Sequence, residues 1–482
     1  MVVESAAPVD DPPPQEPIIN SARIRTGRVL LPGAVIMWVL SAWPLPLPAQ
    51  NTITGPQPAT CTPRRPQLAT GQALGVNLFV NRLDAWVIGE ETQRVSFESW
   101  ARNLRLGWEW DENGFSTNMF SHPIHGAQYF NAGRANCLTF WESIPLAFLG
   151  SWTWEYFGET NRPSLNDFFL TSLGGIALGE MTHRLAETIR DEQATGSERI
   201  TREVFAMLVN PLAGINRLWR GDWATVRPNP PGHSPDAFDV RLKFAGRWVG
   251  QDSVGVCSFC PTLVVDVTYG DPLAQTFDKP FDVFEVRAQV SPDGGGLNVL
   301  EAAGRLYQVE FNSTDSRRRH ALSVTQRYAY SSYSPVFAYG AQSVELGLLS
   351  RVPLPRSWDL HTRASGNLLV MGAVDATNAG TGARDYDFGP GLGFGLEFDF
   401  WKDRHRYLSI RNRAEYLYTV SGVPAEHLVT FSRLEAQFPI SRRVGVGFAA
   451  DVNTRTSSYT EGEAETREFA DIRFFLSWAL GQ

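Results

Sequence analysis

The chain lacks the sequence motifs of the best-marked hydrolases and nucleotide-binding proteins. It contains no Gly-x-Ser-x-Gly nucleophile elbow and no phosphate-binding loop ending in Gly-Lys-Ser or Gly-Lys-Thr. It also lacks a block of basic residues, because its net charge of −8 is spread along 482 residues. Without a basic surface the chain has nothing to neutralise phosphates, so a nucleic-acid partner is excluded.

Cysteine is scarce, at four residues. Cys257 and Cys260 have thioredoxin-like spacing, but that redox chemistry requires the pair at a helix N-terminus, and here it falls in a turn between two strand-like runs. No second pair of ligands follows at zinc-finger spacing, so we expect no metal and no cofactor. We expect a local disulfide or unpaired thiols here, whereas Cys61 and Cys137 could also bridge.

The N-terminus has the order of an export signal. Three arginines in residues 22–28 precede an apolar stretch, residues 29–48, and Ala49 follows it. A permanent membrane anchor is the alternative, but Pro32, Pro44 and two further prolines interrupt the stretch. We therefore predict export with cleavage near Ala49, and we exclude residues 1–49 from the folded protein.

The C-terminal half consists of strand-like stretches separated by Gly, Pro, Asp, Asn and Ser. The pattern predicts about 12 strands. They are Phe238–Gly250, Thr262–Tyr269, Phe281–Val290, Leu297–Phe311, Ala321–Tyr330, Ser343–Val352, Gly366–Val374, Phe388–Phe400, Tyr407–Val420, Leu428–Phe438, Val444–Asn453 and Ala470–Leu480.

Within these strands apolar and polar residues alternate with a period of two, so each strand has one apolar and one polar face. A soluble β-sandwich alternates in the same way and is the alternative fold. However, strands of about 9 to 13 residues match a tilted crossing of a bilayer, and charges of both signs could pair across a polar lumen. The sequence therefore favours an antiparallel transmembrane β-barrel. The charges predicted to face its lumen are Arg411, Arg413, Glu415, Asp471 and Arg473.

Four glycines occupy alternate positions of one predicted strand: Gly389, Gly391, Gly393 and Gly395. Glycine weakens a strand unless another backbone approaches closely or the strand curves sharply. We therefore predict that this row faces the lumen and that part of the preceding helical segment plugs the lumen or caps its mouth.

The segment before the barrel has helical periodicity. Residues Val95–Trp110 fit a helix or a strand, and this choice stays open. Ser164 is a suitable N-cap for the third of the predicted helices, and Gly175 and Gly179 give that helix a small-xxx-small packing face. The predicted helices are His122–Arg134, Leu138–Phe157, Ser164–Arg190 and Ser197–Arg220.

Several separated motifs occur in order over about residues 105–190. They are Asn118-Met-Phe-Ser-His122-Pro-Ile-His125-Gly126, Gly150-Ser151-Trp152-Thr-Trp154-Glu155-Tyr156 with Glu159, Arg162-Pro163-Ser164-Leu-Asn166-Asp167, and Gly174-Gly175 with Leu178-Gly179-Glu180. This stretch resembles the family catalogued as domain of unknown function 3943, which occurs in exported bacterial proteins. The resemblance implies no particular activity.

The helical segment also holds a set of polar residues in apolar surroundings. Glu155 and Glu159 lie one helical turn apart, and His122, His125, Asp167 and Glu180 could join them. Buried carboxylates and imidazoles cost free energy unless they are paired, so they form either a structural network, an acid/base site or a ligand-recognition site. The candidate catalytic residues are His122, His125, Glu155 and Asp167, and the candidate structural partners are Arg134, Glu159, Arg162, Ser164 and Glu180.

The predicted fold class is α+β, an N-terminal helical domain or lumen plug followed by a transmembrane barrel. The predicted units are residues 1–49 (extension and signal), 50–110 (ambiguous), 111–225 (helical), 226–236 (Pro-rich linker) and 237–482 (barrel). We predict a location in an outer membrane of Gram-negative type, with outer-membrane lipids as partners. The expected role is structural, transport or envelope maintenance, and the alternative is an envelope enzyme acting on lipid or lipopolysaccharide.

Overall fold

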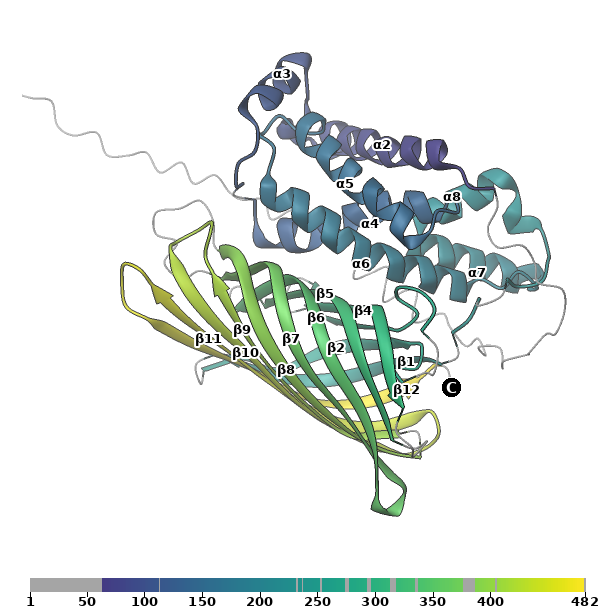
Figure 1. The fold of residues 1–482 in the computed structure, drawn as a ribbon, viewed down its shortest axis with the longest axis vertical. Helices are drawn as coiled ribbons and strands as arrows, with labels where there is room; N and C mark the ends of the chain where they lie inside the picture. The colour runs from purple at the N-terminus through teal and green to yellow at the C-terminus, as the bar shows by residue number, and fades with distance from the viewer. Residues whose placement is uncertain are drawn as a thin grey trace, which may run out of the picture.

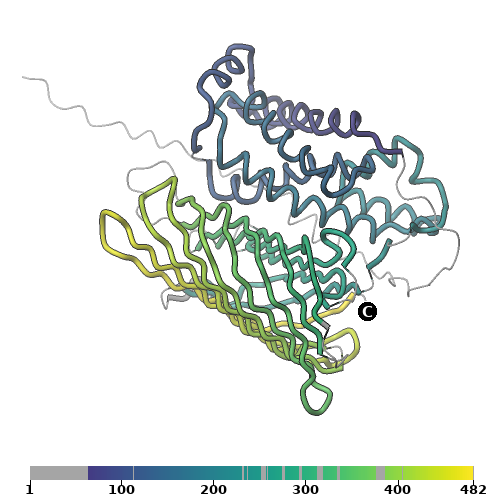
Figure 2. Tube along the Cα trace, in the orientation of Figure 1, coloured from purple at the N-terminus to yellow at the C-terminus, as the bar shows by residue number. Residues whose placement is uncertain are grey.

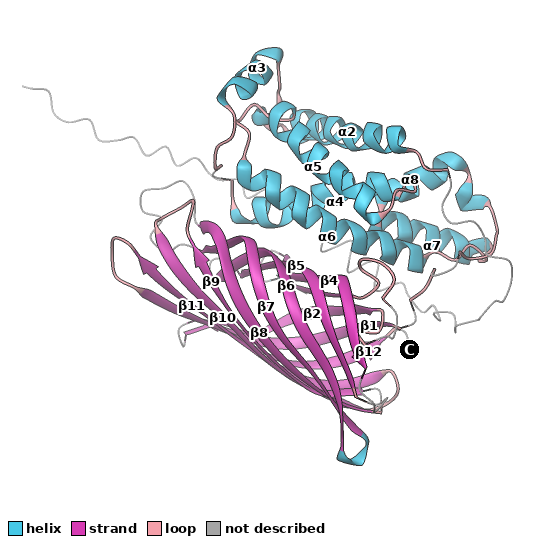
Figure 3. Cartoon of the chain, in the orientation of Figure 1, coloured by secondary structure: helices cyan, strands magenta, loops and turns pink. Residues whose placement is uncertain are grey.

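The computed structural model describes residues 63–480 except 112, 231–232, 236, 252–253, 274–276, 293–295, 313–317, 334–336, 376–385 and 404. The chain forms a helical domain followed by a β-barrel (Figure 1). Helices and strands are confined to separate parts of the chain, apart from one helical turn in the barrel (Figure 3). The predicted signal and Cys61 lie outside the described residues.

The helical domain contains seven α-helices among the described residues, and none of them is long and apolar enough to cross a membrane. Capping residues define several of their starts. Thr139 and Glu142 form a capping box at the start of α5, and the Ser164 hydroxyl accepts a hydrogen bond from the Asp167 amide at the start of α6. The helices are α2 (Pro66–Leu83), α3 (Phe97–Leu106), α4 (His122–Arg134), α5 (Phe140–Phe157), α6 (Leu165–Ile189), α7 (Gly196–Val209) and α8 (Pro211–Arg220).

Two helix predictions need comment. The range predicted for α4 agrees with the structure residue for residue, but the single helix predicted over Ser197–Arg220 is wrong. It breaks into α7 and α8 because Pro211 cannot donate a backbone hydrogen bond and the preceding Asn210 has ψ 87°, outside the helical region. The open segment Val95–Trp110 is helical over Phe97–Leu106, as α3, and Glu109 near its end forms an isolated β-bridge with Ser164.

Twelve antiparallel strands close into a barrel, in which each strand pairs with its neighbours in sequence and β1 pairs with β12. This confirms the predicted fold class and strand number. The strands are β1 (Phe238–Gln251), β2 (Val254–Tyr269), β3 (Phe284–Ser291), β4 (Gly296–Asn312), β5 (Arg319–Tyr333), β6 (Phe337–Leu354), β7 (Trp358–Asp375), β8 (Tyr386–Lys402), β9 (His405–Tyr418), β10 (Ala425–Pro439), β11 (Val444–Tyr459) and β12 (Glu465–Ala479).

The cysteine pair was placed wrongly in a turn, because Cys257 and Cys260 both lie within β2. The register between β1 and β2 shifts beside them, and the two cysteines form a disulfide. This irregularity lets residues three apart meet within a strand, where side chains otherwise alternate faces. Cys137 is also disulfide-bonded.

The outer face of the barrel carries exposed apolar side chains on most of its circumference. We call these residues the apolar belt. They include Phe244, Val344, Leu346, Leu348, Leu368, Val370, Leu392, Phe394, Tyr416, Leu434, Val446, Phe474, Leu476 and Trp478. An outward-facing apolar band with a polar interior is the arrangement of a transmembrane barrel rather than of a soluble sandwich.

The helical domain packs against the outside of the barrel wall (Figures 1 and 2). The strand register aligns Ala302, Tyr328, Gln342 and Met371 in one row across β4–β7. These residues face outward, because they alternate with side chains such as Arg327 that pair inside the barrel. We call the contacted surface the wall patch; it comprises Phe284, Ala302, Gln326, Tyr328, Tyr330, Gly340, Gln342, Met371, Ala373, Tyr386 and Phe388.

Hydrogen bonds fix the helices to the wall patch. The Gln326 side chain donates to the Leu173 carbonyl over 2.8 Å, and the Tyr328 hydroxyl donates to the Met119 carbonyl over 2.6 Å. Gly340 leaves room for the Met119 side chain, which a Cβ atom at that position would meet. The predicted lumen plug is therefore wrong for the described helices, which lie beside the barrel.

The glycine row has a different explanation. A Cβ atom on Gly389 or Gly391 would collide with the carbonyl oxygens of Tyr418 or Tyr416 on the adjacent strand β9. At Gly393 and Gly395 it would meet the Glu415 and Ser365 side chains, which share the inner face. The row therefore allows a close, curved approach between strands and does not accommodate a helix.

Candidate functional site

The candidate site in the helical domain is a set of buried side chains at the start of α6, here called the polar cluster. It consists of Asp111, Asn118, His122, Glu155, Ser164, Asn166 and Asp167, all buried except the half-buried Asp111. The Ser164 amide donates to Glu155 over 2.8 Å, and the Asn166 side chain donates to Asp167 over 2.9 Å. His122 Nε2 lies 3.3 Å from Asp167 Oδ2. Three of the four predicted catalytic residues thus lie around one helix start.

The polar cluster reaches the barrel through two asparagines. The Asn118 side chain donates to Asp111 over 3.1 Å and to the Tyr386 hydroxyl over 2.7 Å. Tyr386 in turn donates to the Asn113 carbonyl over 2.7 Å, and Asn113 lies 3.4 Å from Asp167. A chain of hydrogen bonds therefore runs from the core of the helical domain to the first residue of β8.

Burial sets the protonation states in the polar cluster. Loss of hydration raises the pKa of Asp167 well above its usual value, and the neighbouring Asp111 and Glu155 carboxylates raise it further. Burial likewise raises the pKa of Glu155, with a smaller contribution from Glu159. Burial lowers the pKa of His122 to about 4, against the opposing effect of Asp111. Burial thus favours the uncharged forms of Glu155, Asp167 and His122 alike.

His125 and Glu159 form hydrogen bonds with residues outside the polar cluster. His125 Nε2 lies 2.9 Å from the Tyr129 hydroxyl, which also bonds Asn77 on α2. Burial lowers the pKa of His125 to about 3. Glu159 accepts a hydrogen bond from the Trp154 indole over 2.8 Å, and burial raises its pKa. Through these hydrogen bonds the two residues join α2, α4 and α5.

Of the two arginines predicted as structural partners, Arg134 pairs with the predicted carboxylate Glu180 at 2.7 Å, whereas Arg162 pairs with Glu109 at 2.9 Å. Glu180 is fully buried and also pairs with Arg184 at 2.8 Å. Arg184 continues to Asp282 of the β2–β3 loop at 2.8 Å. This second network therefore also ties the helical domain to the barrel.

Gly175 and Gly179 lie where α6 crosses α4. A Cβ atom on Gly175 would lie 2.6 Å from the Cα atom of Gly126, and one on Gly179 would lie 2.8 Å from the Phe130 ring. Backbone therefore contacts backbone at this crossing, as the small-xxx-small pattern predicts.

The lumen holds the second concentration of charge. Arg411, Arg413, Glu415, Asp471 and Arg473 all point into it and are paired, as the alternation predicted for their faces. Arg433 on β10 reaches Glu301 on β4, on the opposite side of the barrel, at 3.3 Å. Lys243 on β1 reaches Glu435 on β10, three strands away, at 2.6 Å.

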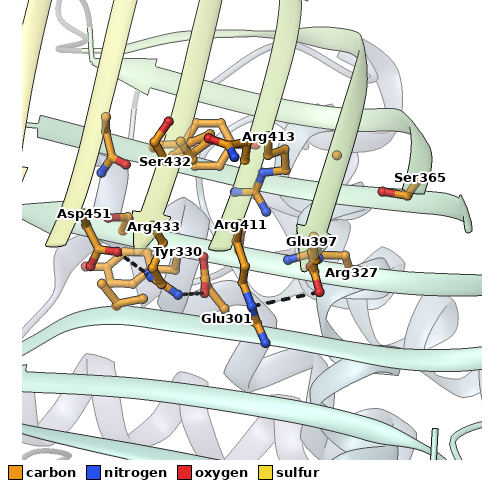
Figure 4. A pocket seen from close by; sticks show the side chains of 18 of the residues that line it. Glu301, Arg327, Tyr330, Ser365, Glu397, Arg411, Arg413, Ser432, Arg433 and Asp451 are labelled. Atoms are coloured by element: carbon orange, nitrogen blue, oxygen red, sulfur yellow. Dashed lines mark hydrogen bonds and ion pairs between the residues drawn. The ribbon is translucent and has the colours of Figure 1, made fainter. Parts of the chain in front are cut away.

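Figure 4 shows Glu301, Arg433 and Asp451 bonded together, with Arg411 beside Glu397. These residues line a cavity of about 70 Å³, which has room for a few water molecules. Other charged side chains of the lumen are buried. Arg473 and Lys243 are 1% exposed, and Asp471 is 0% exposed. Charges that lined an open channel would be hydrated, so the lumen around these residues is filled by side chains.

Sequence reasoning missed several residues that connect the two units. Asp111, Asn118 and Asn166 complete the polar cluster, although the last two belong to the motifs noted above. Gln326 and Gln342 are polar interruptions of otherwise apolar outward faces. A glutamine on a lipid-facing strand indicates a contact with protein, because lipid acyl chains cannot form hydrogen bonds with its amide group.

The chemistry available to the polar cluster is limited by its burial. In the described part of the chain, no group of three His, Cys, Asp or Glu side chains is arranged to hold a metal ion. His122 and Asp167 are 7% and 2% exposed, so a reactant has no direct access to them in this conformation. The arrangement fits a hydrogen-bond network that fixes helices better than it fits an acid/base site.

Comparison with protein families gives one match. Residues 107–212 match the family model described as Domain of unknown function (DUF3943), which confirms the resemblance seen in the motifs. The match includes the polar cluster and the helices α4–α7 and ends within α8. No curated protein matches the sequence.

Among solved structures, similarity is confined to about half of this chain. The FrpB iron transporter from Neisseria meningitidis has 10% identity and a TM-score of 0.24, covering 51% of this chain and 44% of its own. The KdgM porin with oligogalacturonate has 11% identity and a TM-score of 0.23, covering 49% and 98%. The Pseudomonas putida toluene transporter TodX has 8% identity and a TM-score of 0.22, covering 52% and 91%. The twelve-strand closure of this chain, and not these similarities, defines its fold.

Proposed function

We propose that the protein is an outer-membrane barrel with a structural, envelope-maintenance role, which anchors its helical domain beside the barrel wall and does not conduct solutes. The apolar belt supports insertion into a membrane with lipids as partners, and the signal-like N-terminus supports export to the outer membrane. Recovery in the outer-membrane fraction with heat-modifiable mobility on gels tests this location. A soluble protein without heat-modifiable mobility would contradict it.

The proposal that the barrel does not conduct solutes rests on the ion pairs across its lumen. Glu301 and Arg433 come from strands on opposite sides of the barrel, and their pairing closes the space between the walls. Both side chains are largely enclosed, with 24% of Glu301 and 18% of Arg433 exposed, so water screens the pair less than it would at an open surface. A solute would have to break these pairs to pass.

Planar-bilayer recording tests this closure. The native protein is expected to show no large, steady conductance, whereas the double variant Glu301→Ala with Arg433→Ala is expected to show a small conductance, because it removes a link between opposite walls. The matched control removes Arg351 and Asp359, a partly exposed pair on the adjacent strands β6 and β7, and is expected to behave as the native protein does. A large, steady conductance of the native protein would contradict the proposal.

The second candidate function is an envelope enzyme acting on lipid, and the approach of His122 to Asp167 is the observation in its favour. Asp167→Asn separates the two functions, because asparagine keeps the shape and one acceptor but cannot transfer a proton. If the cluster is structural, this variant folds and leaves the envelope lipid profile unchanged. A folded variant with an altered lipid profile would favour the enzyme.

Asp167→Leu serves as the matched control. It removes the carboxylate beside the buried His122 and one of the two acceptors of the Asn166 amide, so the helical domain is expected to lose about 1–3 kcal/mol of stability. Thermal unfolding of the two purified variants measures the difference.

A further inference from the structure

Three helices of the helical domain, α2, α7 and α8, have the reverse polarity of surface helices in a water-soluble protein. On α7 the side chains of Ile200, Val204 and Leu208 recur at four-residue spacing and are exposed, Val204 by 52%. On the opposite side of the same helix Arg202 is buried to 2% exposure and pairs with Glu198 at 2.9 Å. A helix at a water-facing surface places its apolar stripe inward and its charges outward. This helix does the opposite.

The next helix repeats the reversal. On α8 Trp219 is 92% exposed, with Ile215 and Leu218 exposed beside it. Arg217 on its inner side is buried and lies 2.8 Å from Glu192. The buried arginines of α7 and α8 each have a carboxylate partner, so their charges are compensated inside the domain. The outer surface of the same helices consists of large apolar side chains.

Helix α2 shows the same arrangement with neutral residues. Asn77 and Asn81 face the interior, where their side chains donate to the carbonyls of Gly150 and Gly158 over 3.0 and 2.8 Å. Leu78 and Phe79 lie on the outer side and are exposed. Polar side chains that bond backbone, together with glycine contacts such as that between α4 and α6, are how helices associate inside a membrane.

The outer surface of the helical domain is continuous with the apolar belt. Phe140 on α5 packs against Phe281 of the barrel with ring centroids 5.5 Å apart, and its neighbour Trp141 is exposed. On the barrel side, the wall patch is followed directly by belt residues, with Val344 two positions after Gln342 on β6. The row of contacts is perpendicular to tilted strands, so it climbs the wall obliquely instead of following one rim.

We infer that the helical domain is immersed in lipid beside the barrel, and that the outer faces of α2, α7 and α8 contact acyl chains. The inference rests on the membrane location proposed above. Acyl chains fit this surface because they cover large apolar side chains without requiring hydrogen bonds, and because the same lipid already covers the adjoining belt. The helices do not span the bilayer; the barrel holds them in it.

Site-directed fluorescence in vesicles tests the inference on the full chain. A bimane label is attached at Val204→Cys on α7, at Leu346→Cys in the belt, or at Glu461→Cys in the β11–β12 turn, without reductant so that the native disulfides stay closed. The vesicles contain phosphatidylcholine with or without a nitroxide on the acyl chain, and iodide is the aqueous quencher. Thermal mobility on gels shows that each labelled barrel is folded.

The label at residue 204 is expected to lose fluorescence to the acyl-chain nitroxide to the same extent as the label at residue 346, and to be protected from iodide. The label at residue 461 is expected to show the opposite. Quenching at residue 204 by iodide alone would overturn the inference, and protection from both quenchers would overturn it in favour of a second protein chain. If the label at residue 346 also escapes the nitroxide, the proposed membrane location fails instead.

Discussion

Gly175→Leu is expected to unfold the helical domain while leaving the barrel closed. The Cβ atom of the new residue would lie 2.6 Å from the Cα atom of Gly126, so backbone on α4 would have to move. Overpacking costs about 1–3 kcal/mol where side chains can adjust, and a clash with backbone lies at or above the upper end of that range. The expected result is rapid proteolysis of the helical domain together with native heat-modifiable mobility of the barrel.

Gly75→Leu is the matched control for this prediction. Gly75 lies on α2 with no atom within 4 Å of a built Cβ, so leucine meets open space there. Leucine also has a better helix propensity than glycine. The control is expected to resist protease at least as well as the native protein. Equal protease resistance of the two variants would show that α4 and α6 do not cross as described.

Glu180→Leu is expected to be the most damaging loss of a charge in the helical domain. Its carboxylate is completely buried and pairs with both Arg134 and Arg184. Without this carboxylate, the positive charges of Arg134 and Arg184 lose a negative partner. Removing one partner of a buried ion pair costs about 3–5 kcal/mol of folding stability. Because Arg184 also binds Asp282, the substitution is expected to loosen the helical domain from the barrel as well.

Arg64→Gln is the control for the second prediction. Arg64 pairs with Glu142 at 2.8 Å, but both side chains are exposed, so the pair contributes about 0–1 kcal/mol. Thermal unfolding of the purified proteins compares the two variants. A loss of less than about 1 kcal/mol for Glu180→Leu would contradict the role given to the buried network.

The sequence allowed the barrel to be predicted because its signal is local. Alternation with a period of two along 408–420 or the final strand follows directly from strand geometry, and twelve such segments require closure in a lipid environment. The helix starts were equally local, as Ser164 shows by capping α6 at the predicted position. These features depend on neighbours in sequence and not on the arrangement of distant elements.

The relation between the two units could not be predicted in the same way. Whether helices lie inside or beside a barrel depends on which faces meet, and Tyr328 and Met119 meet across 209 positions in sequence. The glycine row suggested a helix inside the lumen because glycine permits close approach, yet the neighbour that approaches is strand β9. The two outward glutamines, Gln326 and Gln342, carried the correct information but were not considered.

The polar cluster illustrates an intermediate case. His122, Glu155 and Asp167 were identified because carboxylates and imidazoles are conspicuous among apolar residues. Asn166 bonds Asp167, and Asn118 bonds Asp111 and Tyr386 beside it. Both asparagines are neutral and common at helix starts and in turns, so composition did not single them out. Their role depends on the Tyr386 hydroxyl and the Asp111 carboxylate, which come from other elements.

The account depends most on the position of the helical domain outside the barrel, and a pair of engineered disulfides tests it directly. A Cβ atom at residue 340 would lie 3.2 Å from the Cβ atom of Met119, so a small outward shift brings the pair to the roughly 3.5–4.5 Å of a disulfide. Met119→Cys with Gly340→Cys is therefore predicted to cross-link under mild oxidation. Tyr339, one residue earlier, faces the lumen, where its hydroxyl bonds Glu415. Met119→Cys with Tyr339→Cys is predicted to stay unlinked, and cross-linking of this pair instead of the first would contradict the placement of the helices beside the wall.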